Sequence, residues 1–360
     1  TICQLCRSSA ELDLELVAGG MALSAAHGAS VRAMEEAGLA PDVRLDWLAD
    51  RPDSVQEEAA RALAMVGDSL AKTQPDAVFL TGDRFETMAA ATAATLLHVP
   101  IAHLHGGEET LGAFDNALRH AITKLAHLHL VSHPAYARRV LAMGEDPATV
   151  HVVGAPGLDA LYDAPPVSRA ELEARLGLPL TPPLVIVTLH PATLGADPAL
   201  EAACVCEVMD RVDATYVITL PNNDPGAEVI RAGLLAAATP PRRVAVEALG
   251  PLYGPLMSHA DAMLGNSSSA LIEAPALGLP AVNLGARQKG RLRGANVLDV
   301  DGPAPVVETM LRRALDPAFR SAIAKEAREM FGGGGASRRV VEILERWAPP
   351  RPPVKATHGV

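Results

Sequence analysis

The chain has 360 residues and a formal net charge of −11; 49% of its residues are hydrophobic and only 3% are aromatic. One hydrophobic core rarely organises this length, so we expect two domains. The acidic charge argues against nucleic acid or an anionic membrane as the main partner. No apolar run reaches the roughly 18 residues of a membrane span, and the first residues do not resemble a secretory leader.

Four cysteines occur in two close pairs, Cys3 with Cys6 and Cys204 with Cys206. Cys3 and Cys6 have the Cys-x-x-Cys spacing but lack the second metal-spaced pair of a common zinc site, and Cys204 and Cys206 alternate on an expected helix. The pattern therefore predicts neither a zinc site nor a redox motif. So few cysteines without a disulfide or metal pattern fit a reducing compartment, so we expect a cytoplasmic protein.

In the first half of the chain, short runs rich in β-branched residues alternate with longer amphipathic stretches. This alternation predicts parallel sheets with helices on both faces. The expected strands are 14–19, 77–81, 100–105, 127–132 and 149–154, and the expected helices are 21–37, 54–73, 86–97, 114–125 and 134–143.

A proline-rich stretch at 164–166 interrupts the pattern, which then resumes. The resulting fold class is α/β, with two Rossmann-like, doubly wound parallel-sheet domains facing a central cleft. A last helix at 336–347 and a loose tail follow. The expected later strands are 184–189, 214–220, 261–264 and 280–284. The first expected domain, 1–165, holds the acid/base side, and the second, 166–335, holds the nucleotide side. The remaining segment, 336–360, begins with a helix that is expected to pack back on the first domain.

Polar residues follow these strands closely. Ligands of open parallel sheets bind beyond the carboxyl ends of the strands, so these residues predict a site there. The candidates in chain order are Asp83, His105, Glu108, His190, Asn222, Asp224, 265–269 and Arg287.

Two signals in the first half also have a structural explanation. Asp83 sits where a helix is expected to begin, so it could serve only as an N-cap. Asp115 and Arg119 are four residues apart on an expected helix, which is the spacing of a surface ion pair.

The second half allows similar alternatives. The stretch 265–269 supplies small side chains and amides at a helix start, which suits a phosphate or a serine-rich cap. Glu273 lies four residues after Ser269, on nearly the same helix face, where it could bind ribose hydroxyls. His190 could reach the cleft or be structural.

The motifs LTGDRFE, PIAHLHGGEETLGAFDNALRHAITKLAHLHLVS, VTLHPAT, LPNNDPG and GNSSSALIEAPALGLPAVNLGARQKGRLRGANVL occur in this order. Together they resemble the hydrolysing UDP-N-acetylglucosamine 2-epimerases of sialic and legionaminic acid pathways, which have the glycosyltransferase-B architecture. The resemblance implies loss of the proton at C2 and of the nucleotide from C1, followed by addition of water to a 2-acetamido-glycal. It implies no cofactor and no metal, a UDP-sugar as substrate, and a homodimer or homotetramer.

The resemblance implies roles for individual residues. Asp83 matches the first catalytic acid, Glu108 and Asp115 match carboxylates that face the sugar, and Arg119 would orient one of these two. Many relatives have Glu where this chain has His105, which leaves open how His105, Glu108 and Asp115 divide the proton transfers.

The second domain would hold the nucleotide. His190 matches a histidine near the diphosphate, or a proton donor. The implied nucleotide-binding residues are Asn222, Gly265, Asn266, Ser267, Ser268, Ser269, Glu273 and Arg287. Relatives also open with a strand that supplies an Arg, whereas this chain begins where the first helix should be under way, so that strand is expected to be missing from the first sheet.

Several functions stay open from the sequence alone. The same chemistry could act on a UDP- or GDP-linked 2,4-diacetamido-2,4,6-trideoxyhexose. A non-hydrolysing epimerase or a glycosyltransferase would share the architecture. A sugar-nucleotide sensor without catalysis would share the binding residues.

Overall fold

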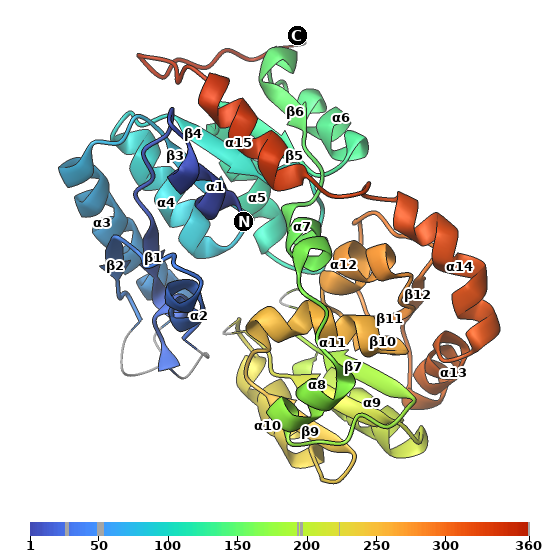
Figure 1. The fold of residues 1–360 in the computed structure, drawn as a ribbon. Coiled ribbons are helices and arrows are strands. Elements are labelled where there is room, and N and C mark those ends of the chain that lie inside the picture. Colours follow the sequence, from blue (N-terminus) through green and yellow to red (C-terminus); the bar gives the residue numbers. More distant parts are fainter. Residues whose placement is uncertain (26–28, 49–53, 193, 195–196, 223, 359–360) are drawn as a thin grey trace. The chain divides into compact units, whose positions relative to one another are not determined.

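The computed structural model describes residues 1–25, 29–48, 54–192, 194, 197–222 and 224–358 (Figure 1). The chain divides into two compact units. Unit 1 comprises Thr1–Glu108, Phe114–Asp159 and Gly334–Val360, and unit 2 comprises Glu109–Ala113 and Ala160–Gly333. None of the described helices is both long and apolar enough to cross a membrane.

Unit 1 contains two parallel sheets. One pairs β1 (Val17–Gly19) with β2 (Val43–Leu45), and the other has the order β3 (Val78–Thr81), β4 (Ile101–Leu104), β5 (Leu128–Val131), β6 (Val150–Val152). The helices of this unit are α1 (Ile2–Ser8), α2 (Val31–Glu36), α3 (Val55–Thr73), α4 (Phe85–Leu96), α5 (Asp115–Leu125), α6 (Pro134–Ala142) and α15 (Ala336–Arg346). Helix α7 (Pro156–Asp163) spans the boundary at Asp159.

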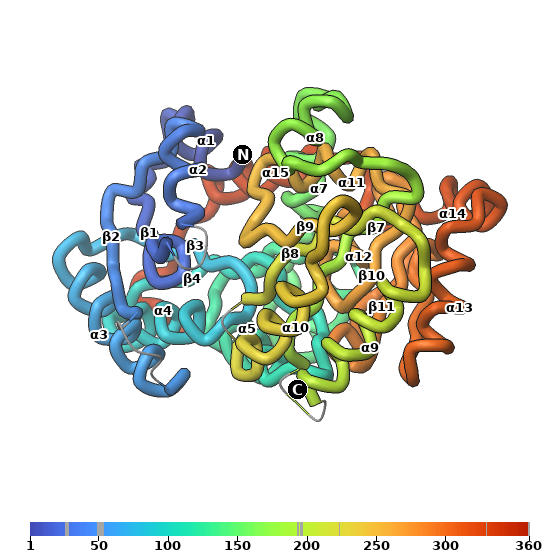
Figure 2. Tube along the Cα trace, turned by 90° about the horizontal axis from the view of Figure 1, so that it is seen from below, coloured from blue at the N-terminus to red at the C-terminus, as the bar shows by residue number. Residues whose placement is uncertain are grey.

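The core of unit 1 joins both ends of the chain. Strands β4 and β5 are buried along their whole length. Helix α15 packs on them through Val340, and Ile2 of α1 joins the same hydrophobic cluster. Figures 1 and 2 both place α1 beside α15, in agreement with their packing contacts. As expected, the chain is helical from its first residues.

Unit 2 contains one parallel sheet with the order β12-β11-β10-β7-β8-β9. Its strands are β7 (Leu184–Thr188), β8 (Thr215–Thr219), β9 (Arg243–Val246), β10 (Ala262–Gly265), β11 (Ala281–Leu284) and β12 (Val297–Val300). Its helices are α8 (Arg169–Leu176), α9 (Pro198–Arg211), α10 (Ala227–Ala237), α11 (Tyr253–His259), α12 (Ser269–Leu277), α13 (Ala304–Ala314) and α14 (Pro317–Glu329). Helices α13 and α14 pack beside β11 and α12 (Figure 2).

Strand β7 shows why this sheet has helices on both faces. Val185 and Val187 belong to one hydrophobic cluster, which includes residues of α9, α10 and α13. Leu184 and Ile186 belong to another, which includes residues of α8, α11 and α12. Because side chains alternate across a strand, an apolar run can fill two cores at once. The predicted α/β class with doubly wound parallel sheets is confirmed.

Two local predictions are wrong. The expected helix at 21–37 is reduced to α2 and a short 3-10 turn, because Ala29 has a φ of 40°, which an α-helix cannot contain. Part of that range, 26–28, lies outside the described residues. The expected loose tail is packed: Lys355 is bonded to Glu145 at 2.6 Å, and the backbone N–H of His358 donates to Gly144.

Candidate active site

In unit 1, three adjacent strands present polar residues at the same sheet edge. Asp83 follows β3 by two residues, His105 comes directly after β4, and Ser132 comes directly after β5. The strands are parallel, and the register pairs Thr81 with Leu104. Their carboxyl ends therefore meet at one edge, which is where ligands of such sheets bind.

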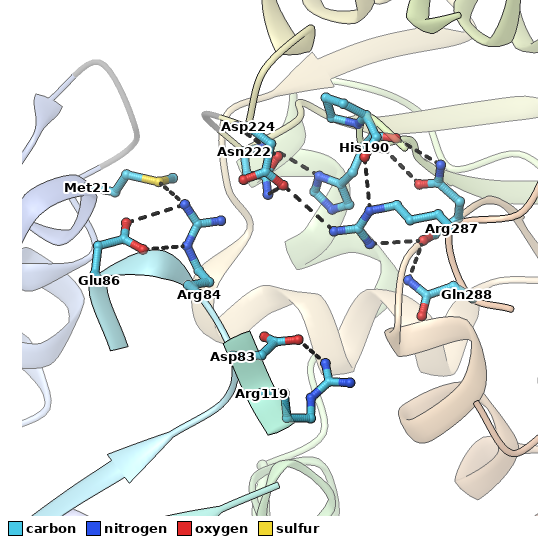
Figure 3. Close-up of polar contacts among 12 residues, drawn as sticks. Met21, Asp83, Arg84, Glu86, Arg119, His190, Asn222, Asp224, Arg287 and Gln288 are labelled. Atoms are coloured by element: carbon cyan, nitrogen blue, oxygen red, sulfur yellow. Dashed lines mark hydrogen bonds and ion pairs between the residues drawn. The ribbon is translucent and has the colours of Figure 1, made fainter. Parts of the chain in front are cut away.

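Asp83 is held by a buried arginine. Arg119 of α5 is 1% exposed and forms an ion pair with the Asp83 carboxylate (Figure 3). Asp83 is not the N-cap of α4, since Arg84 occupies that position. A buried guanidinium needs a carboxylate partner, so this pairing fixes Asp83 in its ionised form. Figure 3 shows Arg84 in a separate contact with Glu86 and Met21.

Glu108 forms the second carboxylate of this edge and is 2% exposed. The Nδ1 atom of His105 lies 2.9 Å from Glu108 Oε1, and the Ser132 hydroxyl donates to the same oxygen at 3.0 Å. An ionised carboxylate only accepts hydrogen bonds, so Nδ1 of His105 carries the proton. In the neutral ring, Nε2 is then the acceptor nitrogen. Ser132 is a site residue that the sequence reasoning missed.

Asp115 is the first residue of α5 and lies one helical turn before Arg119. Both side chains are buried, at 7% and 1% exposure, so the alternative of a surface ion pair is wrong. The helix N-terminus favours a negative charge, which stabilises Asp115 as a carboxylate.

In unit 2, His190 follows β7 and is oriented by two asparagines (Figure 3). The Asn266 side chain accepts from the backbone N–H of His190 and donates to its carbonyl, each at 2.8 Å. The backbone N–H of Asn222 donates to His190 Nδ1 at 3.2 Å. Because Nδ1 accepts here, the proton of the neutral ring is on Nε2.

Arg287 joins the same group of residues (Figure 3). It donates to the carbonyl oxygens of Pro191 and Asn266, at 3.2 and 3.3 Å, and lies 3.9 Å from the Asp224 carboxylate. The Asn222 amide donates to Asp224 at 2.6 Å. These contacts bring together His190, Asn222, Asn266 and Arg287, which come from four separate stretches of the chain.

The start of α12 carries the serine cluster. The hydroxyls of Ser267 and Ser269 lie 2.7 Å apart, and the Tyr253 hydroxyl donates to Ser269 at 2.9 Å. Ser268 is the N-cap and its own side chain makes no capping bond, but the Ser267 hydroxyl accepts from the backbone N–H of Ser269 at 3.3 Å, so this stretch also caps the helix. Hydroxyls and helix amides together suit a phosphate. Glu273 lies one turn further along α12.

Gly265 permits the close packing of this region. Its φ is 134°, and a Cβ would collide with the carbonyl oxygen of Thr188 on the neighbouring strand β7. A side chain at this position would separate β10 from β7, so only glycine is compatible. Gly265 therefore lets β10 lie close to β7, and this fixes where the backbone of the next residue, Asn266, begins.

Glu201 of α9 is a second residue that the sequence reasoning missed. Burial raises the pKa of its carboxyl to about 7, although Arg287 lies close enough to lower it. A Cβ on Gly285 would lie 2.8 Å from Glu201 Oε1. No local sequence signal distinguishes Glu201 from other acids in a first helical turn.

The structure shows no group of three His, Cys, Asp or Glu placed to hold a metal ion within the described residues. Cys3 and Cys6 both lie in α1, and Cys204 and Cys206 both lie in α9. All four are free thiols.

Two Rossmann-like units, each with polar side chains at the carboxyl edge of a parallel sheet, define the glycosyltransferase-B class of fold. A family model described as UDP-N-acetylglucosamine 2-epimerase matches residues 4–345, and the chain belongs to this family. It is therefore a sugar-nucleotide 2-epimerase, and the predicted family is confirmed.

Individual relatives are similar over most of their length. The UDP-N,N'-diacetylbacillosamine 2-epimerase (hydrolyzing) of Legionella pneumophila is 32% identical over 94% of this chain and 89% of its own. The GDP/UDP-N,N'-diacetylbacillosamine 2-epimerase (hydrolyzing) of Campylobacter jejuni is 32% identical over 83% and 79%. The UDP-GlcNAc 2-epimerase structure from Neisseria meningitidis, bound to UDP-GlcNAc, has a TM-score of 0.79 and 18% identity over 95% and 94%.

Proposed function

We propose that this chain is a hydrolysing 2-epimerase of a UDP-linked 2-acetamido sugar. The reaction gives the free 2-epimeric sugar and UDP. The observation that carries this proposal is the pair of held carboxylates at one sheet edge, Asp83 on Arg119 and Glu108 on His105 and Ser132. Two carboxylates with different partners suit two proton transfers of opposite direction.

In the first step, Asp83 takes the proton from C2 while the C1–O bond breaks and UDP leaves. The product is a 2-acetamido-glycal. In the second step, water supplies a hydroxyl to C1, and a proton returns to C2 on the opposite face. His105, through Nε2, and Glu108 supply and accept these protons, with Asp115 beside them. This assignment is part of the proposal.

Unit 2 would bind the leaving nucleotide. Arg287, the Nε2–H of His190 and the hydroxyls of Ser267 and Ser268 offer positive charge and hydrogen-bond donors to a diphosphate. Glu273 would accept hydrogen bonds from ribose hydroxyls. Asn222 and Asn266 act mainly by orienting His190.

For the sugar, UDP-N,N'-diacetylbacillosamine, a 2,4-diacetamido-2,4,6-trideoxyhexose, is our first candidate. Two relatives with 32% identity carry hydrolysing activities on this sugar in their names. UDP-N-acetylglucosamine is the second candidate, because the UDP-N-acetylglucosamine 2-epimerase of Neisseria meningitidis is 30% identical over 76% of this chain.

The test is incubation with each UDP-sugar, and with the GDP-linked diacetamido sugar, in D2O without an acceptor. Proton NMR should show a free 2-epimeric sugar with deuterium at C2, together with the nucleoside diphosphate. An epimer still attached to the nucleotide would indicate a non-hydrolysing enzyme. A requirement for an acceptor would indicate a glycosyltransferase, and binding without turnover would indicate a sensor.

The cytoplasmic location and the homodimer or homotetramer stay predictions. Light scattering of the purified protein tests the oligomer.

A further inference from the structure

His103 is a buried histidine that the mechanism above does not use. It lies on β4, two residues before His105, and is 0% exposed. Burial lowers the pKa of its ring to about 4, so the ring is neutral at physiological pH. A neutral ring has one donor nitrogen and one acceptor nitrogen, and its partners decide which is which.

The two partners of His103 fix its tautomer. Nε2 lies 2.8 Å from the carbonyl oxygen of Gly82, which can only accept, so Nε2 carries the proton. Nδ1 is then the acceptor, and the Thr123 hydroxyl lies 3.3 Å from it and donates to it. The ring therefore connects the loop after β3 with helix α5.

The bond to Gly82 acts on the residue that follows. Gly82 has φ of 83°, and its N–H donates to the carbonyl of Leu104 at 3.1 Å. The Gly82 carbonyl and the Asp83 N–H share one planar peptide group. His103 thus fixes the peptide plane from which the Asp83 side chain begins.

Helix α5 holds Asp83 in two ways, directly through one side chain and indirectly through His103. Arg119 and Thr123 are four residues apart, on one face of the helix. Arg119 binds the Asp83 carboxylate directly, and Thr123 binds His103, which binds the peptide before Asp83. Asp83 is therefore held both at its side chain and at its backbone.

The loop that carries Glu108 also packs against His103. A Cβ on Gly106 would lie 2.9 Å from Thr123 Oγ1 and 3.2 Å from His103 Nδ1. Gly106 thus lies against the bond between these two side chains. Through it, His103 also limits the position of the segment between His105 and Glu108.

We infer that His103 is a positioning residue for catalysis, which sets the orientation of the Asp83 carboxylate through its Nε2–H bond to Gly82. This inference rests on the proposed function, in which Asp83 takes the proton from C2. It predicts that the donor toward Gly82 matters for turnover, whereas the volume of the ring does not.

Two substitutions separate the two ring nitrogens. The amide nitrogen of His103→Gln can reach the place of Nε2 and keep the donor toward Gly82. His103→Asn places its amide near Nδ1 and leaves Gly82 without that donor. We expect kcat of His103→Asn to fall about 100-fold with KM changed less than about 3-fold, as for other supporting residues. His103→Gln should stay within about 10-fold of the wild type.

His129 offers a matched control. It is paired in register with His103 on β5, is 1% exposed, and is bonded to Glu145. His129→Asn should lower the melting temperature but leave kcat per folded molecule unchanged. Equal kcat for His103→Asn and His103→Gln, or equal effects of His103→Asn and His129→Asn on kcat, would overturn the positioning role.

Nitrogen-15 NMR of the histidine rings gives a test without turnover. We expect His103 to remain in the Nε2–H tautomer between pH 6 and pH 9. A proton on Nδ1 would overturn the inference even in an active enzyme. Absence of turnover by the wild type on every sugar nucleotide would instead overturn the proposed function, and the positioning role with it.

Discussion

Asp83 is the residue on which the proposed chemistry depends most. Its carboxylate is ionised against Arg119, and its backbone is held through Gly82. We expect Asp83→Asn to lower kcat by about 1,000-fold, because the amide keeps an oxygen for Arg119 but cannot accept the C2 proton. Steady-state kinetics and a melting curve measure this. The control Asp76→Asn removes an exposed partner of Arg351 and should change neither quantity.

Glu201 makes stability depend on pH. Burial disfavours the charged form of its carboxyl and raises the folded pKa to about 7, above the ordinary value of 4.5. The folded state therefore binds more protons between pH 4.5 and pH 7, and its stability falls as pH rises through this range. Glu201→Gln removes that loss. Relative to the wild type, it should gain about 1 kcal/mol at pH 8 compared with pH 4.5, after allowance for solvent screening.

Urea denaturation at both pH values measures this difference. The control Glu207→Gln removes an exposed partner of Arg211 and should show the same relative stability at both. A Glu201→Gln protein that gains nothing at pH 8 would contradict the assignment.

The sequence predicts where a candidate site residue lies when that residue follows a recognisable strand. Asp83 and His105 follow strands, and the strands were recognisable as apolar runs. The ion pair of Arg119 with Asp83 was not predictable, because it joins positions 36 residues apart. Such partners depend on tertiary packing, which one sequence does not encode locally.

At the scale of elements, burial decides what the sequence predicts. Strands β4 and β7 are buried throughout and occur as apolar runs, and both were predicted. Strands β2, β9 and β12 were not, since each is only partly buried and carries an Arg or an Asp. A short strand with a charged residue does not differ from a loop in its pattern.

Helix α15 is capped by a residue distant in sequence. The Asp159 carboxylate is 4% exposed and accepts from the backbone N–H of Ala336, at 3.1 Å, and of Ser337. We expect Asp159→Ala to cost about 2 kcal/mol, because two buried donors lose their acceptor. Asp316→Ala removes an exposed cap from α14 and should cost about 1 kcal/mol. Chemical denaturation compares the two, and equal costs would contradict this account.

The packed tail depends on Glu145. Burial alone would raise the pKa of this carboxyl, but hydrogen bonds from His129, Lys124 and Lys355 outweigh burial and lower the pKa to about 2. The stabilisation is complete above pH 4.5, the ordinary pKa of this carboxyl, and is lost as pH falls toward 2.

Glu145→Gln should therefore cost about 1–2 kcal/mol at pH 7 and progressively less below pH 4. Thermal melts at both pH values test this. The change should also increase protease cleavage of the tail near Lys355, because the amide cannot pair with the lysine. A cost that does not vary with pH would contradict the role of charge.

At the scale of the whole molecule, a short segment of unit 2 interrupts unit 1, and nothing in the local sequence indicates this interruption. Glu109–Ala113 belongs to unit 2 although both flanking segments belong to unit 1. Within unit 2, the Leu111 N–H donates to the Lys289 carbonyl, and the Leu194 N–H donates to that of Gly112. These are backbone bonds over long sequence separations, which neither composition nor periodicity reveals.

The chain therefore changes unit after Glu108, Ala113, Asp159 and Gly333, and no single cut yields two intact halves. A gene divided after the Asp159 codon gives a first fragment without α15, which supplies Val340 to its core, and a second without 109–113. We expect each fragment alone to aggregate, and co-expression to restore soluble protein in gel filtration. During synthesis, unit 1 therefore receives its last segment only after the whole of unit 2 has been made.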